Sequence, residues 1–193
     1  TSGGIVLNYK ATDRLLIGGR ISPAHTKFNF CNDFGSAKVV ETAFSLHTIY
    51  NFERPLFVYG TFGMGSVDYT IDRNIPLGIT TISHRGKSNG KHYFGSFGVG
   101  YKIKFQDSVS LTPYIAAHYQ KVSLNPYTEE GDIRSTTMSF NFPKRESIVS
   151  ELGTTLQKKY TFKNAQVIPY FTASFCHDFK NTLDQLIQGR VSD

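Results

Sequence analysis

The stretch YFGSFGVGYKIKF, residues 93–105, decides the fold because its apolar side chains recur at every second position. Such alternation is typical of a β-strand, in which successive side chains point to opposite faces. An ordinary strand has about 5–6 residues, whereas a tilted strand that crosses a membrane needs about 9–11. One face of this longer run carries Tyr93, Phe97, Val99, Tyr101, Ile103 and Phe105. The opposite face carries His92, Ser96, Gly98, Gly100, Lys102 and Lys104, with Phe94 as an exception.

Two later runs, SLTPYIAAHYQKV (110–122) and QVIPYFTASFCHDF (166–179), repeat this pattern and place a Pro-Tyr pair near their start. Proline cannot donate to a sheet ladder, so each pair indicates a strand entry just after a turn. The apolar faces of the two runs include Leu111, Ile115, Tyr119, Phe171 and Phe175.

Period-two alternation predicts eight antiparallel strands along the chain. They are 4–10, 15–22, 41–52, 56–70, 91–105, 109–122, 145–159 and 166–179. In the fourth, Phe57 and Tyr59 disagree in parity with Val58 and Phe62, and a bulge is expected to reconcile them.

The connections between these strands alternate in length. Residues 11–14, 53–55, 106–108 and 160–165 read as short turns, and 23–40, 71–90 and 123–144 as long polar loops. An up-and-down barrel in an outer membrane has this arrangement, with tight periplasmic turns and long external loops. The apolar face is then expected to contact lipid, and the opposite face to line a lumen. Candidate lumen residues are His92, Lys102, Lys104, His118, Glu151 and Gln157. Aromatic residues near strand ends are expected to form interfacial girdles: Phe52, Phe57, Tyr59, Tyr69, Tyr93, Phe105, Tyr119, Tyr160 and Phe179.

Composition narrows the function classes. The formal net charge is +6, but the basic residues are scattered, which argues against nucleic-acid binding. No apolar run approaches the roughly 18 residues of a membrane helix. The two cysteines, Cys31 and Cys176, show no metal or redox spacing. They are expected to be isolated, with one long-range disulfide as the alternative.

No motif predicts catalysis, a cofactor or a metal. Gly86-Lys87-Ser88-Asn89-Gly90 fits G-x-S-x-G by letter, but a nucleophile elbow needs a strand, a sharp turn and a helix. A polar external loop is expected there. The six histidines lack metal-ligand spacing, and lumen or surface positions are expected for them. The charges of Asp68, Asp72, Arg73, Glu129, Glu130 and Asp132 are read as solvated loop charge. Lys102, Lys104 and Glu151 are expected to pair with one another or with a threaded linker.

Several stretches together resemble the translocator β-domain of autotransporters (type V secretion), most closely the lipase/esterase-type members. They are GGIVLNYKATDRLLIGGRIS, ETAFSLHTIYNF, FVYGTFGMGSVDYTIDRNIPLG, GKHYFGSFGVGYKIKF, SLTPYIAAHYQKVSLNPYTEEG and RSTTMSFNFPKRESIVSELGTTL. The resemblance implies a twelve-stranded barrel with a helical linker in its pore, and a passenger domain exported to the cell surface. In esterase-type members the passenger is a GDSL-type hydrolase, and the barrel is not catalytic.

The chain is therefore expected to be one partial, all-β domain over residues 1–193, with about eight of twelve strands. The passenger, the linker helix, the first strand and about three last strands are expected to be missing, as is the C-terminal aromatic assembly signal. Expected partners are the lipid bilayer with lipopolysaccharide, the chain's own passenger and linker, and the outer-membrane barrel assembly machinery. The expected location is the outer membrane of a Gram-negative bacterium. A porin-like channel and a soluble lipocalin-like binding barrel are the alternatives.

Overall fold

The computed structural model describes residues 1–53, 55–105, 108–131, 136–141, 144–162, 165–180 and 190–191. Parts of the expected connections at 53–55, 106–108, 123–144 and 160–165, including Asp132, lie outside the described residues, as do the last residues of the chain.

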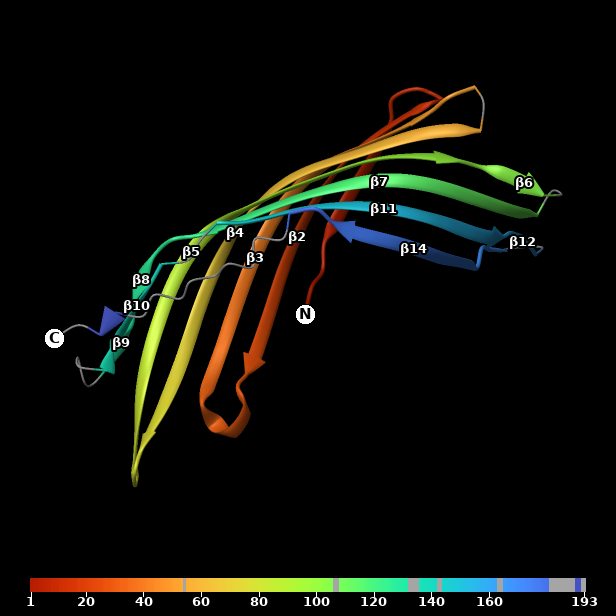
Figure 1. The fold of residues 1–193 in the computed structure, drawn as a ribbon. Helices are drawn as coiled ribbons and strands as arrows, with labels where there is room; N and C mark the ends of the chain where they lie inside the picture. The colour runs from red at the N-terminus through yellow and green to blue at the C-terminus, as the bar shows by residue number, and fades with distance from the viewer. Residues whose placement is uncertain are drawn as a thin grey trace.

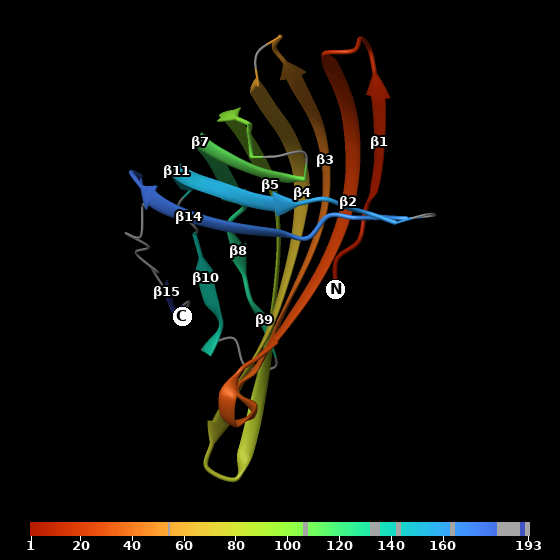
Figure 2. The ribbon, with the colours of Figure 1, turned by 90° about the vertical axis from the view of Figure 1, so that its right-hand side faces the viewer.

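Within the described residues the main sheet has ten strands, and eight of them form one path in chain order, each antiparallel to the next, while β6 pairs with β7 and β9 pairs with β5 off this path. Its order β1-β2-β3-β4-β5-β7-β11-β14 is the predicted up-and-down meander. These strands are β1 (Ile5–Lys10), β2 (Leu15–Asn29), β3 (Gly35–Asn51), β4 (Leu56–Leu77), β5 (Thr80–Tyr101), β7 (Val109–Leu124), β11 (Arg145–Lys158) and β14 (Tyr170–Asp178). The sheet curls into a trough whose free edges are β1 and β14 (Figures 1 and 2).

Short strands complete the fold. Some extend the main strands, and others belong to the connections. They are β6 (Ile103–Phe105), β8 (Tyr127–Thr128), β9 (Glu130–Gly131), β10 (Met138–Phe140), β12 (Tyr160–Thr161), β13 (Gln166–Val167) and β15 (Arg190–Val191), with a single 3-10 turn at Cys31–Asp33. No helix within the described part of the chain has the length and apolar character needed to cross a membrane.

The connections lie at two distinct ends of the sheet (Figure 1). The turns that follow β1, β3, β6 and β12 lie at one end, called here the turn end. The connections β2–β3, β4–β5 and β7–β11 lie at the opposite end, called the extended end. Assignment of the strands to this two-ended meander was therefore correct.

Two of the predicted long loops are wrong. Most of 23–40 belongs to β2 and β3, and nearly all of 71–90 belongs to β4 and β5, which are joined only by Gly78 and Ile79. Gly78 has a φ of +63°, a conformation that glycine adopts without steric penalty. The alternation is hard to recognise in these extensions because the outer face carries no apolar belt and the inner face mixes apolar residues such as Ile71 with polar ones such as Arg73, although the backbone ladder continues.

The predicted bulge in β4 is also wrong. The register of β4 against both neighbours runs without interruption, from Asn51 opposite Phe57 to Gly35 opposite Arg73, and from Leu56 opposite Tyr101 to Leu77 opposite Thr80. Phe57 and Tyr59 therefore point to the face opposite Val58 and Phe62, and a packing arrangement described below explains their position.

Candidate functional site: the two faces of the sheet

The two faces of the sheet differ in chemistry and in crowding. The apolar face carries large side chains that stand exposed, such as Phe97 at 58 %, Ile115 at 58 % and Phe175 at 72 %. The polar face is crowded instead, with Ala116 at 4 % and Ser110 at 6 % exposure. A water-soluble, lipocalin-like barrel buries its large apolar side chains and exposes its polar ones. The sheet described here has the opposite distribution, which argues against the lipocalin-like alternative.

The residues predicted for the lipid-facing side all lie on the apolar face. Val99 is opposite Ile115, Ile103 is opposite Leu111, and Leu152 of β11 lies between Ile115 and Phe175. The same register places Tyr93, Phe97, Tyr101, Phe105, Tyr119 and Phe171 on this face. These exposed apolar residues form a belt across the sheet, called here the apolar belt. It runs from Tyr93 to Tyr101 in β5, from Leu111 to Tyr119 in β7 and from Ile148 to Leu156 in β11. Each segment has about nine residues, the length that a tilted membrane strand needs.

The girdle prediction fails for three aromatic residues. Phe57, Tyr59 and Tyr69 have the parity of Gly63, which places them on the polar face. Tyr93, Tyr119 and Phe179 remain on the apolar face, at the boundary nearest the extended end.

Glycines on the polar face explain the inward aromatics. A Cβ atom on Gly98 would lie 2.3 Å from the ring of Tyr59, and one on Gly100 would lie 2.4 Å from the ring of Phe57. Each ring therefore lies flat over the backbone of the next strand, at a place where any side chain would displace it. Phe94 over Gly63 and Tyr114 over Gly153 repeat the arrangement. The same rule accounts for Phe94, the residue that broke the sequence alternation.

A carboxylate centre joins β7 to β11 on the polar face. Tyr114 Oη donates to Glu151 Oε1 at 2.7 Å, and His118 Nε2 lies 3.0 Å from Glu151 Oε2. Both oxygens of Glu151 therefore have partners, and the group presents a satisfied polar surface rather than a free acid.

A second centre links three strands. His92 Nδ1 of β5 lies 2.6 Å from Glu41 Oε1 of β3, and its Nε2 lies 3.0 Å from the amide nitrogen of Gln120 in β7. Asn8 and His47 make a similar contact of 2.7 Å between β1 and β3. The sequence analysis placed His92 on the polar face, where the structure has it, but nothing in the sequence indicated the partners of His92 and His47, which are 28 to 51 residues away.

The other predicted lumen residues lie on the same face nearer the turn end. Gln157 and Lys104 are both opposite Ser110, and Lys102 falls between Gly100 and Lys104. Among the described residues neither lysine has an ion pair, so pairing with Glu151 is wrong, whereas pairing with a threaded linker stays a prediction. The reason is position along the strand, because Glu151 is opposite Ala116, closer to the middle of β7.

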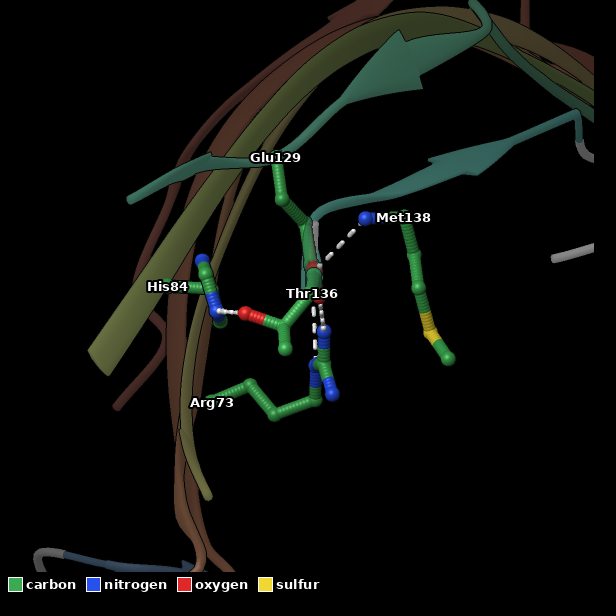
Figure 3. A network of polar contacts seen from close by, with 5 residues as sticks. All are labelled: Arg73, His84, Glu129, Thr136 and Met138. Atoms are coloured by element: carbon green, nitrogen blue, oxygen red, sulfur yellow. Dashed lines mark hydrogen bonds and ion pairs between the residues drawn. The ribbon is translucent and has the colours of Figure 1, made fainter. Parts of the chain in front are cut away.

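At the extended end, residues 127–131 and 136–140, called here the packed segment, lie on the polar face of the β4–β5 hairpin (Figure 3). The guanidinium of Arg73 donates through Nε at 2.9 Å and also through Nη2 to the carboxylate of Glu129. The Met138 backbone N–H donates to Glu129 at 3.2 Å, and His84 Nε2 lies 2.8 Å from Thr136 Oγ1. The hydrogen bond with Glu129 raises the pKa of Arg73.

Tyr127 adds an apolar anchor to the same segment. Its ring covers Gly86, where a Cβ atom would lie 2.1 Å away, and stacks on Phe140 with centroids 5.1 Å apart. Burial raises the pKa of the Tyr127 phenol. The prediction of solvated loop charge is therefore wrong for Arg73 and Glu129, since Glu129 is only 3 % exposed.

The remaining chemical candidates provide no site. Gly86–Gly90 lies within β5 as extended strand, without the turn and helix of a nucleophile elbow. The expectation of a loop there was wrong, because the ladder continues through it. Cys31 and Cys176 are both free and exposed. Within the described residues, no three His, Cys, Asp or Glu side chains gather as a metal site would require.

A curled meander of long strands with an exposed apolar belt and a satisfied polar interior defines a sheet of the outer-membrane barrel class. The family model for the autotransporter β-domain matches residues 2–191, and the chain belongs to this family. Domains of this family are β-barrels of the outer membrane of Gram-negative bacteria and serve as translocators of a passenger domain. A translocator domain is not itself catalytic. Family membership decides against the porin-like and lipocalin-like alternatives.

Individual relatives agree with the family. The chain is 36 % identical over 101 residues to Esterase EstA of Pseudomonas aeruginosa and to Esterase EstA of Pseudomonas putida. That match covers 51 % of this chain but 15 % of each relative, so the chain spans only a small part of their length. The fold is similar to the translocator domain of autotransporter NalP from Neisseria meningitidis, with a TM-score of 0.80 and 16 % identity. The similarity covers 96 % of this chain and 62 % of that one.

Proposed function

We propose that this chain is the membrane-embedded part of a longer surface protein, in which the polar face lines the route of the passenger and its linker. The observation that supports it best is the pairing of an exposed apolar belt with an interior whose carboxylates and histidines bond to one another. Within the hydrocarbon of the bilayer, the hydrogen bonds between neighbouring strands satisfy the backbone N–H and C=O groups. The satisfied interior offers a polar surface along which an extended segment or a helix is able to pass.

The orientation follows from the two ends of the sheet. Counted from one apolar belt segment to the next, the connections at the turn end are short, whereas those at the extended end are long because they include the outer parts of β2, β3, β4 and β5. Short turns belong to the periplasmic side of such barrels and longer connections to the outside. We therefore assign the turn end to the periplasm and the extended end to the cell surface. The outer-membrane barrel assembly machinery is the partner that inserts the domain.

Neighbouring residues on opposite faces of β11 test directly which face meets lipid and which lines the lumen. Leu156 is on the apolar face and 46 % exposed, whereas Gln157 is on the polar face opposite Ser110. In the full-length protein, with Cys31 and Cys176 replaced by serine, Leu156→Cys and Gln157→Cys are compared by thiol labelling in outer membranes. We expect a water-soluble maleimide to label Gln157→Cys when the linker is removed by proteolysis, and a membrane-partitioning reagent alone to label Leu156→Cys. Equal labelling of both positions by the water-soluble reagent contradicts the proposal.

The similarity to two proteins named as esterases supports a second, narrower proposal, that the passenger of this protein is an ester hydrolase. Cells that display the full-length protein should hydrolyse a short-chain p-nitrophenyl ester. Protease treatment of intact cells should release or abolish that activity. Activity that resists external protease, or no activity with a displayed passenger, argues against this assignment while leaving the translocator role in place.

A further inference from the structure

A basic hollow lies on the apolar-face side of the sheet, just beyond the belt at the extended end. It has a volume of about 580 Å³ and spans β4, β5, β7 and Lys144, the residue just before β11. Its lining includes Lys91, Lys121 and Lys144, together with Tyr93, Asp68 and Asn125. The three lysines are far apart in the sequence, and only strand pairing brings them to one place.

The register fixes the height of this hollow. Tyr93 is the last ring of the belt on β5, and Lys91 stands two residues further along the same face, about 7 Å at the usual rise per residue. Lys121 is directly opposite Tyr93. With the orientation proposed above, on which this inference rests, the ammonium groups lie where the belt gives way to the headgroups of the outer leaflet.

The charge in and around the hollow is unbalanced. Lys121 Nζ contacts Glu146 at 2.8 Å, and Lys180 contacts the same carboxylate at 2.5 Å. Lys91 and Lys144 have no ion pair among the described residues, and both are exposed. Asp68 is the acidic side chain of the lining. Two lysines are therefore available to an anion from outside the protein.

Phosphate is the anion that lysine ammonium groups bind as point charges, and tyrosine is the ring that settles at a membrane interface. A ligand that reaches the hollow from the side must already be in the leaflet, because the wall below it is the lipid-facing belt. We propose that this hollow binds a phosphorylated lipid headgroup of the outer leaflet, with Lys91 and Lys144 as its main contacts and Lys121 held in place by Glu146.

The test uses the full-length protein in detergent micelles and measures affinity for lipid A in bisphosphorylated and dephosphorylated forms, with inorganic phosphate as a third probe. One interfacial lysine contributes about fivefold in binding, so the double variant Lys91→Gln/Lys144→Gln should lose about 30-fold for the phosphorylated form. The variant Lys91→Arg/Lys144→Arg keeps both charges and should keep most of the affinity.

The chain offers a matched control. Lys27 and Lys38 are opposite one another on the same side of β2 and β3, but Lys27 stands six residues beyond Ile21, about 20 Å from the belt. Lys27→Gln/Lys38→Gln removes the same charge far from the headgroups and should leave binding unchanged.

Each outcome decides the matter. Loss confined to the hollow variant, and to phosphorylated lipid A, supports the proposal. Equal loss in the two double variants indicates non-specific attraction and overturns it, as does undiminished binding by the hollow variant or equal affinity for dephosphorylated lipid. Binding of inorganic phosphate with the same affinity as lipid A assigns the site to a free anion and refutes a lipid ligand. A wrong assignment of the lipid-facing and lumen-facing sides would instead appear in the labelling of Leu156→Cys and Gln157→Cys, which involves none of these lysines.

Discussion

The ion pair between Arg73 and Glu129 is expected to hold residues 127–131 and 136–140 against the polar face of the β4–β5 hairpin. The Glu129 side chain is fully buried and the Arg73 side chain is 25 % exposed. Arg73→Met removes both guanidinium donors and leaves the carboxylate with the Met138 N–H. Removal of one partner from a buried pair costs about 3–5 kcal/mol, and the partial exposure of Arg73 places this case near 3 kcal/mol.

The sheet itself does not depend on this contact, so the loss should appear as local opening of the segment. Hydrogen exchange at the Glu129 amide, which donates to the Met138 carbonyl at 2.9 Å, should accelerate by up to about 150-fold, the equivalent of 3 kcal/mol. Exchange in the middle of β7 and β11 should not change. Adding Glu129→Gln to Arg73→Met should restore part of the protection, because the uncompensated charge is gone.

Arg85→Met is the control, because Arg85 lies on the other face of the same hairpin and its partner Asp72 is exposed. Exposed pairs contribute little, so protection of Glu129 should be unchanged. Unaltered exchange in Arg73→Met, or acceleration of equal size in both variants, refutes the idea that this pair closes the segment.

Three further outcomes follow from the faces of the sheet. Gly98→Val should destabilise the fold by about 1–3 kcal/mol in urea titrations because its side chain displaces the ring of Tyr59, whereas Gly60→Val, whose Cβ meets no atom closer than 3.8 Å, should be tolerated. Leu152→Arg, at the middle of the apolar belt, should lower folding stability in lipid by about 2–4 kcal/mol; folding yield equal to that of the unmodified protein would show that this face does not meet lipid. Two lysine partners, Lys121 and Lys180, lower the pKa of Glu146 to about 2. The stabilisation that these ion pairs give to the folded state is therefore complete above about pH 4.5 and is lost as the pH falls through 2. The protection of the Phe179 amide against hydrogen exchange should therefore fall over this pH range. If a Glu146→Gln variant keeps the same pH dependence, a group other than Glu146 causes it.

The sequence alone determined the eight strands, their antiparallel order and the parity of each face. These properties follow from side chains within one strand, because a two-residue period is a local property of the chain. The belt residues from Tyr93 to Phe175 could be predicted from the sequence for the same reason.

The extensions at 23–29 and 71–77 were not predicted, because their outer face carries no apolar belt and their inner face mixes apolar with polar residues, such as Ile71 with Arg73, although backbone pairing continues. The position of the Phe57 and Tyr59 side chains on the polar face could not be predicted from the sequence either, because it depends on Gly100 and Gly98 in the next strand. Only the tertiary structure brought Glu129 to Arg73, His92 to Glu41, and the three lysines of the hollow together. The physical reason is that register across a sheet decides such partners, and register is set by the whole curled ladder rather than by any single strand.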